Sequence, residues 1–504
     1  MIELLRLMVW SSWLCIASLI IQKAECQSMK EYDMIVLGSG AGMNVASTAF
    51  EQGMKVAIVE RGPLGGTCLL RGCIPTKILT YVADVITELQ HAERVNLHAE
   101  VTSIDFEDLM NRMREETVGE SEKMGQSVRS VEGYDWYHVT GEFVDDHVMK
   151  VGDEKITAPI IVLAAGSRPL IPPIDGVEDV DYLTNKTVLE LEKRPKSMII
   201  VGGGYIAAEL GHFFSAVGTD VTIIGRNPFL VKREDEDVSQ LLKEELSKRM
   251  EVLTNWEVIK AAQDGDEKTV TARDRTNDET REFKAEHVLV AAGRRSNADL
   301  FKPEKTGVET DERGFIKVDD YFRTKKEGIW AFGDAIGGHM FRHLANDESQ
   351  IVWYNIQRTM NAQEDEEPEL LSMSYHAVPR AVFSNPQIAT VGKTLVEAKE
   401  TGRTLLVGKA GYGEVAKGAA MGYPPGFARV ICDADTQEIL GATVIGPHAP
   451  ILIHEVINLM YTERRSYVPV FRAMHIHPAL SELVQRAFGR MRPLNEGQHH
   501  HHHH

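Results

Sequence analysis

Residues 34–43 read MIVLGSGAGM, a short apolar run followed by a glycine-rich turn. A continuous apolar run before glycines is typical of a buried parallel strand that enters a helix through a tight turn. Gly38 makes that turn, and Gly40 lets the backbone approach a pyrophosphate at the N-terminus of the helix. The third position of the glycine pattern holds Met43, with Gly42 just before it, so we expect the helix to lie slightly further from the strand.

An acidic residue follows this loop at the spacing of a ribose-binding carboxylate. Glu60 lies 20 residues after Gly40 and ends the apolar run Val56–Val59. A carboxylate in this place accepts hydrogen bonds from the adenosine ribose of a bound dinucleotide. The alternative is a solvated charge at the end of a strand.

The same pattern recurs at Met198–Val201, where Gly202, Gly204 and Ala207 follow. Two such units in one chain predict two dinucleotides bound side by side. The two loops also differ at the ribose position.

The second loop has Gly225 where the ribose-binding acid is expected. Arg226 follows at once, and Lys232 and Arg233 lie one short loop further on. A phosphorylated ribose is favoured here, because no carboxylate repels it and basic residues are near. The sequence therefore predicts NADPH over NADH; the alternative is that Arg226 lies on a solvated turn and has no effect on the choice.

Two cysteines, Cys68 and Cys73, lie five positions apart in GGTCLLRGCIPTK, residues 65–77. They follow the part of the chain that is predicted to hold the first dinucleotide. This order favours a redox-active pair over a buried, inert one. Cys15 and Cys26 lie near the N-terminus, and Cys432 stands in an apolar run that predicts a core residue.

The composition is that of a globular chain with several domains. The 504 residues are 43% hydrophobic and 26% charged, which excludes fibrous and disordered classes. The net charge of -19 disfavours nucleic acid and anionic membranes as partners. It fits a salt-loving source as well as an ordinary acidic cytoplasmic protein. We expect no metal site, because the histidines at 499–504 form an expression tag.

Residues 1–28 form an N-terminal extension with an apolar run from Met8 to Ile21. We expect an over-long gene prediction with the true start at Met29, and therefore a cytoplasmic location. The alternative is a signal sequence or anchor in residues 1–28. Near the other end, after about residue 370, strands and helices alternate without a glycine loop, which is typical of α+β material in a dimerisation domain.

The chain resembles the class I pyridine nucleotide-disulfide oxidoreductases over residues 32–488. The supporting runs are AAGSRP from Ala164, AAGR from Ala291, AFGDA from Ala331 and HIHPALSE from His475. The resemblance implies an α/β fold with two Rossmann-like dinucleotide-binding domains and a C-terminal α+β dimerisation domain. The boundaries that we expect are 29–166 and 297–368 for FAD, 167–296 for NAD(P)H, 369–490 for dimerisation and 491–504 for the tail.

The resemblance also implies FAD and a nicotinamide nucleotide as cofactors, and the second loop favours NADPH over NADH. On this basis Lys77 and Glu209 form an ion pair beside the flavin, Asp334 binds the ribityl hydroxyls, and Tyr205 is a lid over the flavin. The full set of expected cofactor-binding residues is Gly38, Gly40, Glu60, Gly66, Thr67, Lys77, Ala165, Gly166, Ser167, Asp334, Gly202, Gly204, Tyr205, Ile206, Glu209, Arg226 and Gly293.

Four residues carry the implied catalysis. Cys73 is the thiolate nearer the flavin, and Cys68 is the interchange thiol that attacks a substrate disulfide. His477 is the base, and Glu482 orients its imidazole. The resemblance implies a homodimer in which His477 is supplied across the interface, whereas His475 is expected to be structural.

Within the family, the stretches YGEVAKGAAM from Tyr412 and HPALSELVQRAF from His477 are most similar to mycothione reductase. We therefore expect reduction of a low-molecular-weight disulfide, bis-γ-glutamylcystine in the case of a halophilic archaeon. The alternative is a dihydrolipoamide dehydrogenase that uses NAD and serves a 2-oxoacid dehydrogenase complex. Mercuric reductase is a minority interpretation, because no cysteine follows Cys432, and a flavoprotein sensor without turnover is another. Arg71 departs from the family pattern by placing a charge between the redox cysteines.

Overall fold

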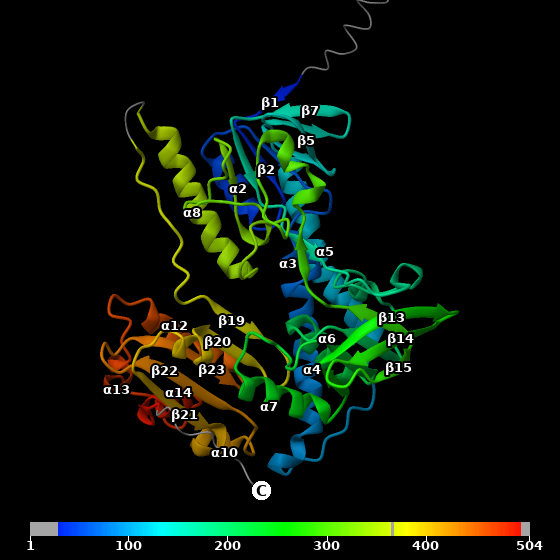
Figure 1. The fold of residues 1–504 in the computed structure, drawn as a ribbon, viewed down its shortest axis with the longest axis vertical. Coiled ribbons are helices and arrows are strands. Elements are labelled where there is room, and N and C mark those ends of the chain that lie inside the picture. The colour runs from blue at the N-terminus through cyan, green and yellow to red at the C-terminus, as the bar shows by residue number, and fades with distance from the viewer. Residues whose placement is uncertain (1–28, 364–366, 495–504) are drawn as a thin grey trace, which may run out of the picture. The chain divides into compact units, whose positions relative to one another are not determined.

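The computed structural model describes residues 29–363 and 367–494 (Figure 1). The extension expected at residues 1–28, and most of the expected tail, lie outside the described residues. The chain divides into two compact units. Unit one comprises residues 29–68, 120–168 and 295–373, without 364–366, and unit two comprises residues 69–119, 169–294 and 374–494. The domain boundaries predicted from the sequence remain a proposal.

Unit one is built on a parallel sheet of five strands in the order β18-β8-β2-β3-β4. Numbered along the chain, this is the order 5-4-1-2-3, which is the doubly wound order of a Rossmann fold. The predicted strands 34–37 and 56–59 are β2 and β3 and lie side by side. The bounds are β2 (Met34–Leu37), β3 (Val56–Val59), β4 (Tyr134–Tyr137), β8 (Ile160–Leu163) and β18 (Ile329–Ala331).

The strands of this sheet are apolar throughout because both faces are buried. Met34 and Val36 pack with the helices α2 (Gly42–Glu51) and α8 (Arg342–Asn361). Ile35 and Leu37 point to the other face and pack with Phe143 and Met149 of a smaller sheet. Figure 1 shows α2 and α8 beside β2. The smaller sheet contains β1 (Lys30–Glu31), β5 (Glu142–Asp145), β6 (Val148–Val151) and β7 (Glu154–Thr157).

Unit two contains a second parallel sheet, in the order β12-β11-β10-β16. Strand β10 (Ser197–Val201) alternates in the same way. Ile200 packs against helices α4 (Cys73–Gln90) and α6 (Tyr205–Ala216), and Ile199 packs against an antiparallel sheet. The strands are β10 (Ser197–Val201), β11 (Asp220–Gly225), β12 (Glu251–Thr254) and β16 (His287–Val290). The antiparallel sheet is β13 (Trp256–Asp264), β14 (Glu267–Asp274) and β15 (Thr280–Ala285).

Five further helices belong to this part of the chain; α3 contains Cys68, α4 begins at Cys73 and α6 follows the second glycine loop. Their bounds are α3 (Gly66–Arg71), α4 (Cys73–Gln90), α5 (Phe106–Arg129), α6 (Tyr205–Ala216) and α7 (Glu236–Ser247). Short strands β9 (Ser167–Pro169) and β17 (Arg294–Ser296) complete these regions. No helix among residues 29–363 and 367–494 is long and apolar enough to cross a membrane.

The C-terminal part of unit two is an antiparallel sheet in the order β19-β20-β23-β22-β21-β24, with a buried core that includes Cys432. The strands are β19 (Pro379–Val382), β20 (Ile388–Gly392), β21 (Leu405–Gly411), β22 (Phe427–Asp433), β23 (Ile439–Ile445) and β24 (Arg492–Pro493). The helices are α9 (Leu395–Lys399), α10 (Ala416–Ala420), α11 (Ala449–Leu452), α12 (His454–Met460), α13 (Val468–Arg472) and α14 (Ser481–Gly489).

The apolar segment Ile451 to Tyr461, which the sequence predicts as a single helix, is interrupted and forms parts of α11 and α12. The carbonyl of Ile453 accepts hydrogen bonds from the amides of both Val456 and Ile457, each at 3.1 Å. The bond to Val456 spans three residues and tightens the turn at this point. The helical spacing of apolar residues over the segment does not indicate this tighter turn.

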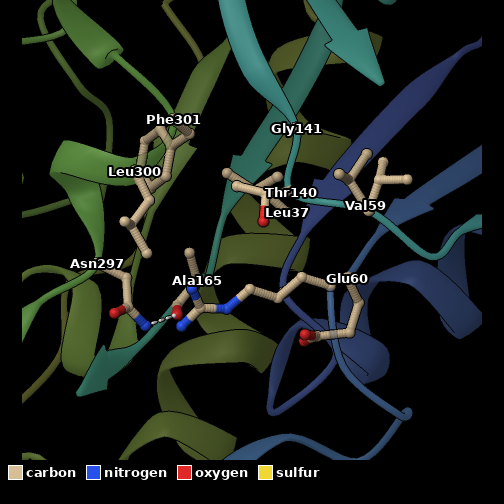
Figure 2. Close-up of a pocket in the computed structure, with 12 residues that line it drawn as sticks. Leu37, Val59, Glu60, Thr140, Gly141, Ala165, Asn297, Leu300 and Phe301 are labelled. Carbon is tan, nitrogen blue, oxygen red and sulfur yellow. Dashed lines mark hydrogen bonds between the residues drawn. The ribbon is translucent and has the colours of Figure 1, made fainter. Parts of the chain in front are cut away.

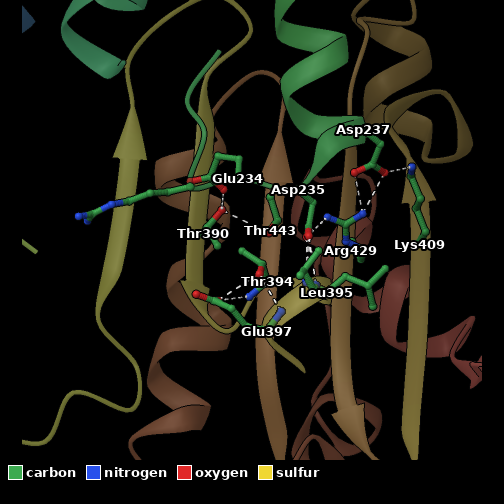
Figure 3. A network of polar contacts seen from close by, with 12 residues as sticks. Glu234, Asp235, Asp237, Thr390, Thr394, Leu395, Glu397, Lys409, Arg429 and Thr443 are labelled. Carbon is green, nitrogen blue, oxygen red and sulfur yellow. Dashed lines mark hydrogen bonds and ion pairs between the residues drawn. The ribbon is translucent and has the colours of Figure 1, made fainter. Parts of the chain in front are cut away.

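A buried ionic network fixes the start of α7 on the C-terminal sheet (Figure 3). Arg429 of β22 is 5% exposed and donates hydrogen bonds to Asp235 and Asp237. Asp235 also accepts from the amide of Leu395 at 3.0 Å. Beside it, Glu234 accepts from Arg380 and from Thr390, both at 2.6 Å. These contacts join two parts of unit two that are more than 100 residues apart in the chain.

Candidate active site

Gly38 forms the tight turn at the carboxyl end of β2. Its φ is +101°, and a Cβ at this position would lie 2.3 Å from the carbonyl oxygen of Ala164. Its amide donates to the carbonyl of Val59 at 2.9 Å. The turn therefore lies between the ends of β3 and β8, where the strand order reverses and where open α/β sheets bind their ligands.

Two further glycines allow close backbone approach around this turn. A Cβ on Gly66, whose φ is +67°, would lie 2.6 Å from the Cα of Gly40. A Cβ on Gly42 would lie 3.0 Å from Val36 Cγ1. The expectation of a wider spacing between helix and strand, which rested on Met43, needs correction, because Gly42 provides the close contact one position earlier.

The carboxylate of Glu60 is held by the loop itself. Its Oε2 accepts from the amide of Ser39 at 3.1 Å and from the hydroxyl of Ser39 at 3.0 Å, and its Oε1 accepts from the amide of Gly62 at 2.8 Å. A carboxylate has about four acceptor sites, so these three bonds fix its orientation and leave capacity for a ligand hydroxyl.

Glu60 lies at the edge of a pocket in unit one (Figure 2). Figure 2 shows Glu60 and Asn297 near the same opening, with the Asn297 side-chain amide donating to the carbonyl of Ala165 at 2.8 Å. The pocket collects segments that follow β2, β3, β4 and β8. Its lining is Leu37, Gly38, Val59, Glu60, Arg61, Val139, Thr140, Gly141, Ala165, Asn297, Leu300 and Phe301.

The remaining predicted residues of unit one lie at the same edge of the sheet. Ser167, just after β8, donates its hydroxyl to Asp334 Oδ2 at 2.5 Å. Asp334 lies in a short 3-10 helix, Gly333–Ala335, that follows β18. Gly166, with φ +68°, accepts from the amide of Asn297 at 3.2 Å. Parallel strands bring their carboxyl ends to one edge, so residues far apart in sequence gather there.

The second glycine loop repeats the geometry of the first. Gly202 has φ +140°, and a Cβ there would lie 2.2 Å from the carbonyl oxygen of Ala291. Its amide donates to the carbonyl of Ile224 at 2.9 Å, as the amide of Gly38 does to Val59. The residues that follow the acceptors Val59 and Ile224 therefore occupy equivalent positions. Gly225 of the second loop stands where the first loop has Glu60.

Gly225 leaves little room for a side chain. A Cβ there would lie 3.3 Å from the Cα of Gly203. Arg226 follows with an exposed side chain, and Lys232 and Arg233 are exposed as well. The carbonyl of Arg226 accepts a hydrogen bond from Nη1 of Arg275 at 2.9 Å. Sequence reasoning missed Arg275, because the turn after β14 carries no motif that connects it to this loop.

Other predicted residues of the second loop lie around the start of α6. Tyr205 is its first residue and is 40% exposed. Ile206 packs against the core of unit two, whereas a Cβ on Gly204 would meet no heavy atom within 4 Å among the described residues. Gly293, with φ +144°, accepts at its carbonyl from the amide of Leu170 at 2.9 Å.

The cysteines lie on two successive helices. Cys68 and Thr67 belong to α3, and Cys73 is the first residue of α4. Both cysteines are of intermediate exposure. A thiol at the N-terminus of an 18-residue helix is in a position that stabilises the thiolate. Between them, the carbonyl of Arg71 accepts from the side-chain amide of Asn185 at 2.7 Å, a contact that the sequence did not indicate.

Lys77 and Glu209 form an ion pair one helical turn after Cys73. Lys77 Nζ lies 2.7 Å from Glu209 Oε2, and the Glu209 side chain is 4% exposed. Glu209 Oε1 accepts from the amide of Phe383 at 2.9 Å, and Lys77 Nζ lies 4.6 Å from the centre of the Phe383 ring. Residues four apart on a helix share a face, so Lys77 lies on the side of α4 that carries Cys73.

His477 and Glu482 are in contact, with Nδ1 and Oε1 2.9 Å apart. Glu482 Oε2 accepts from the amide of Ala479 at 3.3 Å, and the hydrogen bond from His477 lowers the pKa of Glu482. The His477 ring is 71% exposed, and in the described part of the chain its Nε2 has no hydrogen bond. An Nδ1–H held by Glu482 leaves Nε2 as a proton acceptor.

His475 is placed differently from His477. Its side chain is 6% exposed, and its Nε2 lies 2.7 Å from Glu455 Oε1. A buried ring that contacts an acidic side chain fits a structural role, whereas the His477 ring is exposed to solvent.

Two doubly wound sheets, each with a glycine loop, and a cysteine pair on two successive helices define a class of proteins, the flavin-dependent disulfide reductases. A family model described as pyridine nucleotide-disulphide oxidoreductase matches residues 32–365, and the dimerisation domain of that family matches residues 378–488. The chain belongs to the pyridine nucleotide-disulphide oxidoreductase family.

Relatives with different names are similar to this chain at nearly equal levels. Mycothione reductase of Mycobacterium tuberculosis is 33% identical over 91% of this chain and 99% of the relative. Dihydrolipoyl dehydrogenase of Chlamydia pneumoniae is 32% identical, over 90% and 95%. Mercuric reductase of Staphylococcus aureus is also 32% identical, over 84% and 76%.

A solved structure has the same fold. The HOCl-induced flavoprotein disulfide reductase RclA from Escherichia coli has a TM-score of 0.78 and 26% identity, and the match covers 91% of this chain and 99% of that one. The fold class, the enzyme class and the family predicted from the sequence are confirmed.

The family uses FAD and NAD(P)H, and the residues of the two loops fit these cofactors. In unit one, Gly38, Gly40 and Gly66 leave the backbone accessible for a pyrophosphate, and Glu60 is oriented for a ribose. In unit two, Gly202 and the open position at Gly204 repeat the backbone arrangement.

Proposed function

We propose that this protein is an NADPH-dependent reductase of a low-molecular-weight disulfide, similar in activity to mycothione reductase. The observation that carries the proposal is Gly225, which stands in the place of Glu60 and is followed by the exposed Arg226. Relatives with different substrates are almost equally similar to the chain, so overall identity does not select among them. The nucleotide loop therefore separates the candidates best.

FAD held by the Gly38 loop and Glu60 would supply the two-electron chemistry that links NADPH to reduction of the Cys68–Cys73 disulfide. The resulting thiol pair would then act on the substrate. The Cys68 thiolate attacks one sulfur of the substrate disulfide, which forms a mixed disulfide and releases the first product thiol. Cys73 next attacks the sulfur of Cys68, which restores the Cys68–Cys73 disulfide and releases the second product thiol.

Each released thiolate needs a proton, and His477 is suited to supply it. Glu482 holds Nδ1 at 2.9 Å, so Nε2 exchanges the proton with sulfur. Lys77, paired with the buried Glu209, would place a positive charge beside the flavin. The family match at residues 378–488 supports a homodimer, and in this proposal His477 acts on the cysteines of the partner subunit.

Exposed apolar side chains next to His477 in the chain support burial by a second subunit. Ile476 is 78% exposed and Met474 is 99% exposed. Large exposed apolar side chains are typical of an interface between subunits.

A second candidate is a dihydrolipoamide dehydrogenase that uses NAD and serves a 2-oxoacid dehydrogenase complex. It is favoured by the 32% identity to the chlamydial dihydrolipoyl dehydrogenase over 90% of this chain. A cytoplasmic location is part of both proposals and is tested by cell fractionation.

Steady-state oxidation of NADPH and NADH by the FAD-loaded protein, with lipoamide, bis-γ-glutamylcystine or a mycothione analogue, tests the proposal. We expect turnover of a small thiol disulfide with NADPH and little turnover of lipoamide. Rapid turnover of lipoamide with NADH would contradict the proposal and favour the second candidate.

A further inference from the structure

Arg275 is held against the loop that carries Arg226. It follows the last residue of β14, and its guanidinium Nη1 donates to the carbonyl of Arg226 at 2.9 Å. Its own amide donates to the carbonyl of Asn255 at 2.9 Å. Both the backbone and the side chain of Arg275 are therefore fixed at the carboxyl end of β11.

Asn255 joins the three loops that meet at this edge. Its amide donates to the carbonyl of Asn227 at 2.8 Å, and its side-chain nitrogen donates to the hydroxyl of Thr276 at 2.8 Å. The loops after β11, β12 and β14 are thus bonded to one another. This arrangement keeps the Arg275 guanidinium beside the ribose position of the second nucleotide site.

Most donors of Arg275 remain available to a ligand. A guanidinium has five N–H donors, and in residues 29–363 and 367–494 the Arg275 side chain makes only the bond to Arg226. The nearby acid Asp274 accepts from the amide of Thr276 at 2.7 Å, and Asp278 pairs with Arg273 at 3.8 Å. Two exposed arginines, Arg226 and Arg275, are therefore joined through the Arg226 carbonyl, next to a position where Gly225 offers no carboxylate.

We propose that Arg275 is a specificity-determining residue that binds the 2′-phosphate of NADPH together with Arg226. A guanidinium binds phosphate oxygens through paired N–H donors, and two such groups are well suited to a dianionic phosphate. The inference rests on the proposed NADPH preference and adds a residue from a different sheet. The hydrogen bond from Arg275 to the carbonyl of Arg226 would by itself only stabilise the loop. The experiment must therefore distinguish phosphate binding from stabilisation of the loop.

Isothermal titration of the FAD-loaded protein with adenosine 2′,5′-bisphosphate and with 5′-AMP makes this separation. The variants are Arg275→Met, Arg275→Lys and Arg226→Met. The matched control is Arg281→Met, which removes an exposed arginine of β15 that pairs with Glu251 at 2.8 Å. A hydrogen bond to a charged group typically stabilises a complex enough to change its affinity by about tenfold or more. We therefore expect Arg275→Met to weaken the binding of the bisphosphate by about tenfold or more. Binding of 5′-AMP stays within about twofold, Arg275→Lys recovers part of the loss, and Arg281→Met changes neither ligand.

Two results would overturn the inference about Arg275 while the NADPH preference stands. In one, Arg275→Met weakens both ligands equally, which assigns the residue to loop support. In the other, it changes neither ligand although the unaltered protein prefers the bisphosphate. If the unaltered protein does not prefer the bisphosphate over 5′-AMP, the NADPH preference fails and the role of Arg275 fails with it.

Discussion

Glu482 and Glu455 each hold a histidine ring, and the two pairs differ in exposure. Glu482 contacts the exposed His477, and Glu455 contacts the buried His475. Glu482 contacts an exposed ring whose Nε2 reaches solvent, which fits a role in proton transfer. Glu455 contacts a buried ring, which fits a role in stabilising the fold. The two glutamates therefore give a matched comparison at the scale of single residues.

We expect Glu482→Gln to lower the rate of disulfide reduction by about tenfold or more, because the neutral amide no longer stabilises a proton on His477. Steady-state kcat with NADPH and a disulfide measures the effect, and the control is Glu455→Gln. The control should change the melting temperature more than kcat. Equal losses of kcat in both variants would contradict a special role for Glu482.

The pH range of this contact follows from the lowered pKa of Glu482, whose main cause is the hydrogen bond from His477. A carboxyl with a lowered folded pKa stays charged above its usual value of about 4.3, and its contact is lost only as the pH falls through the lowered pKa. The Glu482 carboxylate should therefore stay charged between about pH 5 and 8, and its contact with His477 should be lost only at lower pH.

At the scale of elements, the start of α7 is fixed by charges that are buried among the strands of the C-terminal sheet (Figure 3). Arg429 is 5% exposed, and its partners Asp235 and Asp237 come from a segment that precedes or begins α7. Removing one partner of a buried pair leaves the other charge uncompensated.

We expect Arg429→Met to lower the free energy of unfolding by about 3–5 kcal/mol. Urea denaturation of the FAD-loaded protein measures it. Arg281→Met removes an exposed pair in the same unit and should change the stability by no more than about 1 kcal/mol. A change for Arg429→Met as small as that of the control would show that the network contributes nothing to stability.

The effect of Arg429→Met should depend on pH. Burial raises the pKa of Asp237, but the charges of Arg429 and Lys409 outweigh it and leave the pKa lowered. The stabilisation is therefore complete above the unfolded pKa of about 3.9 and is lost as the pH falls through the lowered pKa. The difference between the variant and the unaltered protein should shrink below about pH 4.

Local patterns in the sequence predicted the strands and loops well, because both faces of the parallel strands are buried and the glycines occur at fixed offsets. The apolar runs at 34–37 and 56–59 are β2 and β3, and Gly38 makes the expected turn. The contact between Arg275 and Arg226 could not be predicted, because it joins turns of two different sheets. At Ile453, where the helix is interrupted, one carbonyl accepts hydrogen bonds from two amides. The pattern of apolar residues carries no information about this backbone geometry.

At the scale of the whole molecule, the chain combines two nucleotide-binding regions, a cysteine pair and a segment that matches a dimerisation domain. In the proposed function these parts make one electron path, from NADPH to Cys68 and Cys73 and then to a small disulfide. Cys432 is buried and burial raises the pKa of its thiol, so it should stay unreactive. The cysteines thus differ in a way that chemical labelling detects.

Thiol labelling of the FAD-loaded protein under anaerobic conditions is the decisive experiment for the proposed electron path. The air-oxidised protein is alkylated with iodoacetamide, with and without prior addition of NADPH, and the labelled peptides are identified by mass spectrometry. We expect NADPH to make Cys68 and Cys73 alkylatable, and a small disulfide added before the alkylation to reverse this. Labelling of Cys68 and Cys73 that does not depend on NADPH would contradict the electron path.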